Sequence, residues 1–282
     1  MTQIKLSPTN LAFAQQYQLL LDTYQEETQI FATNLQNNTT DELLPKVAYR
    51  GGVYCDNQLE LLFLNANPHN LVLFSEHHHI GAIKALVQDL AYNQIEIKGI
   101  LAQKDVCDVF IAEYKKILPA EFILNTAMDI MRLDHLIKPN PIGTLVCADV
   151  EETDFILHCM YDFNVECLHE AISYSNLLTK YQERIINHKF YIYYNENHIK
   201  TSIVMLSRDL KDGKAITAVY TLPEFRGKGY ATSMMYYACE IVFSQGYRYA
   251  TLFVDQSNPI SNRVYQKIGF YILTNAYDYR LK

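Results

Sequence analysis

The 282-residue sequence contains no tryptophan, and it lacks several patterns that point directly to a class of protein. Its six cysteines are scattered and form no CxxC pair, so reduced thiols are expected rather than a disulfide framework. No apolar run approaches the roughly 18 residues that a membrane-spanning helix requires. The N-terminal stretch has no charged segment followed by an unbroken apolar core, the pattern of a secretory signal. We therefore expect a cytoplasmic protein with no membrane partner.

An excess of positive charge is also missing. Lys and Arg number 24 against 31 Asp and Glu, a formal net charge of -7. Because nonspecific binding to nucleic acid or to a membrane surface depends on cationic patches, neither is expected as the main activity. The residues that are present, 49% hydrophobic and 20% charged, are typical of a globular protein with a sizeable core. The length is comfortable for two packed units.

Two prolines in the stretch KPNPIG, Lys138 to Gly143, mark the best linker in the chain. We place a domain boundary there, which gives residues 1–138 and 139–282. The first part is expected to begin with one long helix, Ser7 to Ala32, and to continue with short strands and amphipathic helices. The second part alternates in the same way, with helices predicted from Gly229 to Gln245 and from Pro259 to Ile268. This mixture predicts an α/β (α+β) protein.

The stretch TLPEFRGKGYATSM, Thr221 to Met234, predicts a strand, a turn and the start of a helix. The first turn of a helix leaves backbone N–H groups without intrahelical partners, and the helix dipole adds positive potential there. Gly227 and Gly229 allow positive φ and a close approach of the backbone to an anion, while Arg226 and Lys228 add charge. The pattern is neither a Walker loop nor a Rossmann fingerprint. Taken alone it indicates either an anion site or a tight connection.

A second pattern follows about thirty residues later, after the predicted strand YATLFVD. Asn258-Pro259 ends that strand and starts a helix, and Tyr265 lies two turns along the helix. Gly269-Phe270 ends the helix and leads into a strand. In isolation, Asn258 is interpreted as a helix cap and Tyr265 as a packed aromatic residue.

Together the two stretches closely resemble the GNAT superfamily of acyl-CoA-dependent N-acyltransferases, over about Ile142 to Lys282. The R-x-x-G-x-A signature and the closing N-x6-Y-x3-GF pattern are both present. The matching residues are Arg226, Gly229, Ala231, Asn258, Tyr265, Gly269 and Phe270.

The first part of the chain has a looser resemblance to bacterial GNAT proteins that carry a divergent second acetyltransferase-like domain in front. No phosphate-turn signature occurs between Met1 and Lys138. That domain is therefore interpreted as non-catalytic, completing the acceptor cleft or forming a subunit contact such as that of a homodimer.

The resemblance implies a GNAT fold, a mixed and mostly antiparallel sheet flanked by helices, preceded by a smaller or degenerate GNAT-like α/β domain. It implies acetyl-CoA as cosubstrate, no metal, and direct attack by a small-molecule or peptide amine in a ternary complex. The pyrophosphate would lie on the turn, and the pantetheine arm would pair with a strand and meet Asn258. The residues implied in cofactor binding are Val219, Tyr220, Thr221, Arg226, Gly227, Lys228, Gly229, Tyr230, Ala231, Asn258 and Ser261.

The catalytic residues are less well defined than the cofactor site. The resemblance implies that Tyr265 faces the thioester sulfur. Many family members carry a glutamate base at the position of Ala215, which cannot serve, so Glu166 and Glu224 are the candidates, with solvated surface carboxylates as the alternative. The missing carboxylate leaves open a second function, a non-catalytic acyl-CoA-binding or regulatory module. Transfer of a larger acyl group is a third alternative.

Three consecutive histidines, His77 to His79, are the most visible metal-ligand pattern. Consecutive side chains point in different directions on a strand or a helix, so one ion would rarely meet all three. No metal site is predicted.

Overall fold

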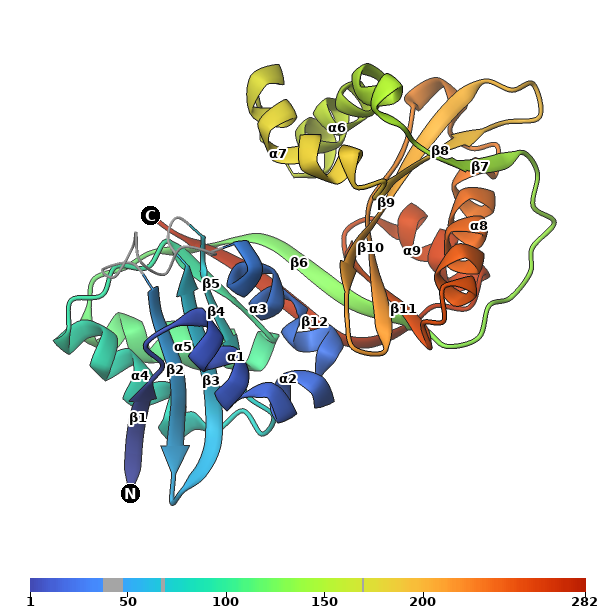
Figure 1. Ribbon diagram of the computed structural model, residues 1–282. Coiled ribbons are helices and arrows are strands. Elements are labelled where there is room, and N and C mark those ends of the chain that lie inside the picture. The colour runs from blue at the N-terminus through green and yellow to red at the C-terminus, as the bar shows by residue number, and fades with distance from the viewer. Residues whose placement is uncertain (38–47, 67–68, 169) are drawn as a thin grey trace. The chain divides into compact units, whose positions relative to one another are not determined.

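The computed structural model describes residues 1–37, 48–66, 69–168 and 170–282, and its contacts divide the chain into two compact units (Figure 1). Unit 1 comprises Met1–Ile130, Asp255–Ser257 and Leu273–Lys282, and unit 2 comprises Met131–Val254 and Asn258–Ile272. Residues at the C-terminus therefore pack with unit 1. The functional division of the chain at 138/139 stays a prediction. No helix in the described ranges is long and apolar enough to cross a membrane.

Unit 1 is a sheet with helices on both faces. Leu62, Leu64 and Phe74 pack against the first three helices, while Leu61 and Phe63 pack against α4 and α5. This alternation is the period of two that a strand imposes. The strand order is β1-β2-β3-β4-β5-β12-β6, with β4 and β5 parallel. The elements are β1 (Thr2–Leu6), α1 (Asn10–Gln16), α2 (Gln18–Thr23), α3 (Gln25–Asn37), β2 (Ala48–Cys55), β3 (Gln58–Ala66), β4 (Leu71–Phe74), α4 (Ile80–Tyr92), β5 (Gly99–Ala102), α5 (Lys104–Ile117) and β6 (Phe122–Leu133).

The long N-terminal helix predicted from Ser7 to Ala32 is wrong. The chain forms α1, α2 and α3 there, with breaks at Tyr17 and Tyr24. Phe13 and Phe31 stack with ring centroids 6.0 Å apart, whereas 18 positions along one straight helix would separate them by about 27 Å. Burial of these rings in one cluster therefore overrides the helical periodicity.

From β7 onward, the chain repeats the order of the elements of unit 1. A first strand and its helices are followed by three antiparallel strands, a helix, a strand parallel to the third, another helix and a last strand. Figure 1 shows α6 and α7 on one face of the sheet and α8 on the other. The strand order is β11-β10-β9-β8-β7. The elements are β7 (Thr144–Cys147), α6 (Thr153–Cys167), α7 (Tyr174–Ile186), β8 (Phe190–Tyr194), β9 (Lys200–Asp209), β10 (Gly213–Thr221), α8 (Tyr230–Ser244), β11 (Tyr249–Asp255) and α9 (Pro259–Lys267). The chain ends with β12 (Tyr271–Leu281), most of which belongs to unit 1.

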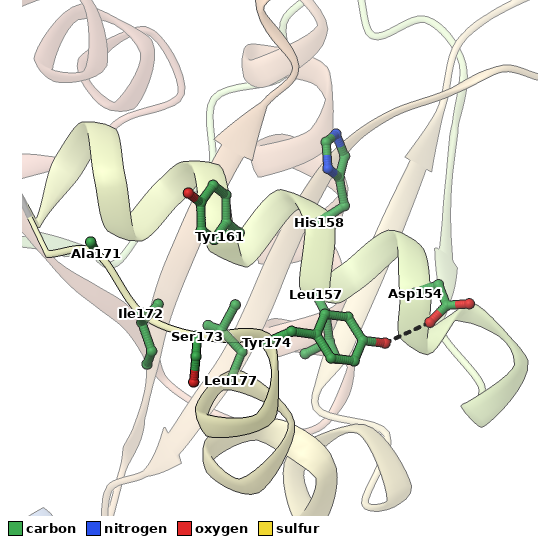
Figure 2. Close-up of a pocket in the computed structure, with 9 residues that line it drawn as sticks. All are labelled: Asp154, Leu157, His158, Tyr161, Ala171, Ile172, Ser173, Tyr174 and Leu177. Carbon is green, nitrogen blue, oxygen red and sulfur yellow. Dashed lines mark hydrogen bonds between the residues drawn. The ribbon is translucent and has the colours of Figure 1, made fainter.

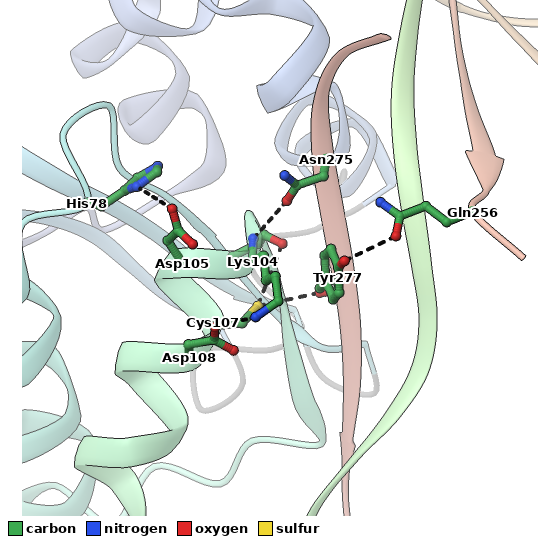
Figure 3. A network of polar contacts seen from close by, with 9 residues as sticks. His78, Lys104, Asp105, Cys107, Asp108, Gln256, Asn275 and Tyr277 are labelled. Carbon is green, nitrogen blue, oxygen red and sulfur yellow. Dashed lines mark hydrogen bonds and ion pairs between the residues drawn. The ribbon is translucent and has the colours of Figure 1, made fainter.

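The last strand, β12, is attached to unit 1 by side chains as well as by its pairing with β5 (Figure 3). Asn275 Oδ1 accepts the backbone N–H of Lys104 at 2.9 Å, at the start of α5, where Gln103 provides no side-chain cap. Cys107 Sγ lies 3.6 Å from the carbonyl oxygen of Tyr277. A residue about 170 positions away thus caps α5, which explains why the end of the chain belongs to unit 1.

An irregularity in β10 decides which way its last residues face. The pairing of β10 with β9 shifts register between Thr217 and Tyr220, and Ala218 has φ +52°. Ile216 belongs to the core under α8, but Ala218 and Tyr220 belong to the core under α6. An extra residue in one strand reverses the facing of the residues that follow it. The bulge therefore turns the Tyr220 side chain toward α6.

Candidate functional site

The turn between β10 and α8 has the backbone form expected of an anion site. Gly227 and Gly229 have φ +76° and +84°, and Gly229 is the N-cap of α8. The helical hydrogen bonds of α8 begin with the Ser233 N–H, which donates to the carbonyl oxygen of Gly229 at 3.1 Å. The N–H groups of Tyr230, Ala231 and Thr232 therefore have no intrahelical acceptor. A Cβ on either glycine would meet nothing within 4 Å, so glycine is required for its φ rather than for space.

Beside this turn, two parallel strands separate. β10 pairs with β11 only at Gly213, Lys214 and Ala215. Thr221 and Tyr220 remain paired with β9 on the other side. The last part of β10 therefore has one backbone edge without a β11 partner, and this edge can pair with an extended ligand as a strand would.

Helix α9 supplies the third wall. Asn258 caps it, with Oδ1 accepting the Ser261 N–H at 3.0 Å, and Pro259 occupies the first turn. Tyr265 is 6% exposed and packs edge-to-face on Phe270, with centroids 5.9 Å apart. Burial raises the pKa of the Tyr265 phenol well above its ordinary value, with smaller contributions from nearby thiols. Tyr265 is therefore a hydrogen-bond donor over the whole physiological pH range.

These three features enclose one pocket of about 440 Å³ within unit 2. Among the residues that the structure describes, the lining excludes two predicted site residues, Lys228 and Glu224. The predicted residues that do line it are Glu166, Val219, Tyr220, Thr221, Arg226, Gly227, Gly229, Tyr230, Ala231, Asn258, Ser261 and Tyr265. Sequence reasoning missed Cys167, Phe225, Thr232, Ile260, Val264, Arg263 and Lys267. The four-residue spacing of the last two on one helix face was the available signal.

The two candidate bases lie in different surroundings. Glu224 is exposed, in a short 3-10 turn (Pro223–Phe225). The Glu166 carboxylate accepts two hydrogen bonds, one from the Tyr220 hydroxyl and one from the Arg226 guanidinium. Burial raises the pKa of Glu166, but these two donors outweigh it, and the net pKa is lowered. Glu166 is thus a carboxylate that stays ionised and takes up a proton reluctantly.

The corresponding turn of unit 1, between β4 and α4, differs from the Gly227–Gly229 turn in two ways. Its N-cap residue is not a glycine, and one of its N–H groups has a side-chain partner. Its N-cap is His79, with φ −66°, and His79 Nδ1 accepts the Ala82 N–H at 3.1 Å. A side chain of the protein itself therefore occupies part of the position where an anion would bind. This agrees with the lack of a phosphate-turn signature in residues 1–138.

The three histidines have three separate surroundings. His77 lies 3.9 Å from Glu76, and His78 lies 3.4 Å from Asp105 (Figure 3), while His79 caps α4. Across the described ranges, no group of three or more His, Cys, Asp and Glu side chains could hold a metal ion.

A second hollow of about 560 Å³ lies between α6 and α7 (Figure 2). Tyr174 donates a hydrogen bond to Asp154 across it, at 2.7 Å, and His158 and Tyr161 project from α6. None of the described residues that line it is a glycine, and its acidic group is Asp154. It therefore lacks the glycine turn that opens the first pocket.

A glycine turn at a helix entrance, a separating pair of parallel strands and a buried tyrosine in one pocket define the class of acyl-CoA-dependent acyltransferases. Residues 157–270 match the family described as "Acetyltransferase (GNAT) family". Residues 157–270 thus form a GNAT acetyltransferase domain, which is consistent with an acyltransferase. The family takes acyl groups from acyl-CoA.

Solved structures show the same fold at low sequence identity. A GNAT-family acetyltransferase from Colwellia psychrerythraea has a TM-score of 0.61 and 12% identity, covering 100% of both chains. A GCN5-related N-acetyltransferase from Sphaerobacter thermophilus has a TM-score of 0.63 and 11% identity, covering 99% of this chain and 94% of that one. A tandem GNAT protein from the clavulanic acid biosynthesis pathway has a TM-score of 0.56 and 11% identity, covering 100% and 98%. No curated protein matches the chain.

Proposed function

We propose that unit 2 transfers an acetyl group from acetyl-CoA to an amine by direct attack in a ternary complex. The observation that carries this proposal is the separation of β10 from β11 after Ala215, directly beside the Gly227–Gly229 turn and Tyr265. Acceptors of GNAT enzymes are generally amines. The acceptor is either a small molecule or a peptide.

The pocket fits the three parts of the cosubstrate. The N–H groups from Gly227 to Ala231 would hold the pyrophosphate, and Arg226 adds a positive charge beside them. The free edge of β10, Val219 to Thr221, would pair with the pantetheine arm. Asn258 Oδ1 is used by the helix cap, which leaves its amide N–H₂ as a donor to that arm. The cosubstrate supplies an activated acyl group as a thioester.

Tyr265 is proposed to stabilise the departing sulfur. Its raised pKa makes complete proton transfer to a thiolate unfavourable, since a thiol has an ordinary pKa near 8.5. A hydrogen bond from the protonated phenol to the developing charge needs no such transfer. The role of Tyr265 is therefore charge stabilisation more than acid catalysis.

The attacking amine has to be neutral, and a lysine-like amine is almost fully protonated at pH 7. Glu166 and Glu224 are the two carboxylates that the sequence offers as a base. Glu166 lines the pocket, but its lowered pKa favours holding a cation, while Glu224 lies outside the lining. A carboxylate with a lowered pKa and a second carboxylate outside the pocket are both poorly suited to act as a base. This observation favours a second function, a non-catalytic acyl-CoA-binding module.

Mass spectrometry after incubation with acetyl-CoA and a mixed panel of amines tests the proposal. We expect one or more amines to gain an acetyl group, with release of an equal amount of free CoA thiol. A binding module would retain CoA and release no thiol. Propionyl-CoA and longer acyl-CoA esters in parallel reactions show whether the pocket prefers a larger acyl group.

A further inference from the structure

Glu166, at the last turn of α6, connects three segments of the pocket wall. Its Oε1 accepts the Tyr220 hydroxyl at 2.6 Å, and its Oε2 accepts Arg226 Nη2 at 2.8 Å. Tyr220 is on β10, and Arg226 directly precedes Gly227. One carboxylate thus joins α6, β10 and the start of the phosphate turn. We call Glu166, Tyr220 and Arg226 the carboxylate brace.

Further contacts hold the Arg226 side chain in one orientation. Its Nε donates to the carbonyl oxygen of Thr221 at 2.9 Å, and its guanidinium carbon lies 5.2 Å from the centroid of the Tyr220 ring. Phe163 packs edge-to-face on the Tyr220 ring, with centroids 6.4 Å apart. A guanidinium has five N–H donors, so these two bonds leave others that can reach a bound anion. Arg226 can therefore contact Glu166 and a phosphate at the same time.

The brace acts at the start of a turn that a second basic side chain also supports, since Lys228 Nζ donates to the carbonyl oxygen of Glu224 at 3.2 Å. The N–H groups of the turn are offered by backbone that includes Gly227 and Gly229, and glycine has more conformations to lose than any other residue. Ordering such a segment when a ligand binds costs affinity, and a contact that orders it beforehand reduces that cost. Because Arg226 is covalently next to Gly227, fixing Arg226 fixes one end of the turn.

We propose that Glu166 is a positioning residue for the pyrophosphate site, acting through Arg226 and Tyr220, and is not the base. This inference rests on the proposed function, because it takes an acyl-CoA as the ligand of the turn. It accounts for the hydrogen bonds that Tyr220 and Arg226 donate to Glu166, which a general base facing a protonated amine would not need.

Glu166→Ala, Glu166→Gln and the control Glu183→Gln test the inference. Glu183 is an exposed carboxylate on α7 outside the pocket, so its variant makes the same change of charge away from the brace. For Glu166→Ala we expect the Kd of CoA to rise about fivefold, because an ion pair whose side chains are 45% and 39% exposed contributes at most about 1 kcal/mol. Glu166→Gln keeps an acceptor for the Tyr220 hydroxyl, so its Kd for CoA should lie between those of the wild type and Glu166→Ala. Pantetheine, which has no pyrophosphate, should bind all four proteins equally by NMR titration.

Two further readouts separate positioning from catalysis. In steady-state kinetics the loss in Glu166→Ala should fall on the KM for acetyl-CoA more than on kcat, because a saturating ligand orders the turn itself. Amide hydrogen exchange of residues 226–231, measured with no ligand, should be faster in Glu166→Ala and normal in Glu183→Gln.

A fall in kcat with an unchanged Kd for CoA would make Glu166 the base and overturn the inference. Equal weakening of CoA and pantetheine, or unchanged hydrogen exchange at the turn, would overturn it as well. Failure of the wild-type protein to bind CoA is a different result. It would refute the proposed function, and the inference would fall with it.

Discussion

Replacing Tyr265 with Phe is expected to lower kcat by about 10²-fold, the usual effect of removing one donor that stabilises charge in a transition state. The Kd of acetyl-CoA should change little, because the buried ring and its packing on Phe270 are kept. Only the hydroxyl is lost. Single-turnover kinetics measures the chemical step, and calorimetric titration measures the Kd.

Tyr271→Phe is the matched control for this prediction. It removes a phenol hydroxyl from a 45% exposed tyrosine that lies outside the pocket and bonds to Asp134. Its kcat should equal that of the wild type. An unchanged single-turnover rate in Tyr265→Phe would remove the phenol from the mechanism. A large rise in the Kd instead would make Tyr265 a binding residue.

The parts of the site that the sequence predicts are local ones. Positive φ at Gly227 and Gly229, the cap at Asn258 and the start of α9 at Pro259 each depend on a few neighbouring residues. The strand Tyr249–Asp255 and helix α8 follow their hydrophobic periods and are confirmed. These features also carry the resemblance to the family, so most of the candidate pocket could be predicted from residues close together in the chain.

The parts that could not be predicted depend on contacts between distant residues. The bulge at Ala218 turns Tyr220 toward α6, and a non-glycine residue in a strand gives no signal for it. Tyr220 meets Glu166, 54 residues away, only because of that turn. Likewise, Asn275 caps α5 at Lys104, so the end of the chain completes unit 1. Periodicity describes one element at a time and contains no information on such pairs.

Replacing Gly229 should weaken CoA binding in a graded way, Asn least, Ala more and Val most. At φ +84° an L side chain costs about 1–2 kcal/mol, less for Asn and more for a β-branched residue. Relief of this strain would move the N–H groups that open α8. For Gly229→Ala we expect the Kd of CoA to rise about tenfold or more, since tenfold corresponds to about 1.4 kcal/mol.

Gly246 offers a control with the same strain at the other end of α8. Its φ is +91°, and a Cβ there would also meet nothing within 4 Å. Gly246→Ala should therefore lower Tm by about as much as Gly229→Ala, because both place alanine in the left-handed region. Only the Gly229 variant should also lose affinity for CoA, measured by calorimetric titration.

If both variants lose the same stability and both keep full affinity, the anion does not lie on this turn. If Gly229→Asn binds CoA as the wild type does while Gly229→Val does not bind it, the backbone conformation at Gly229, rather than the absence of a side chain, holds the pyrophosphate.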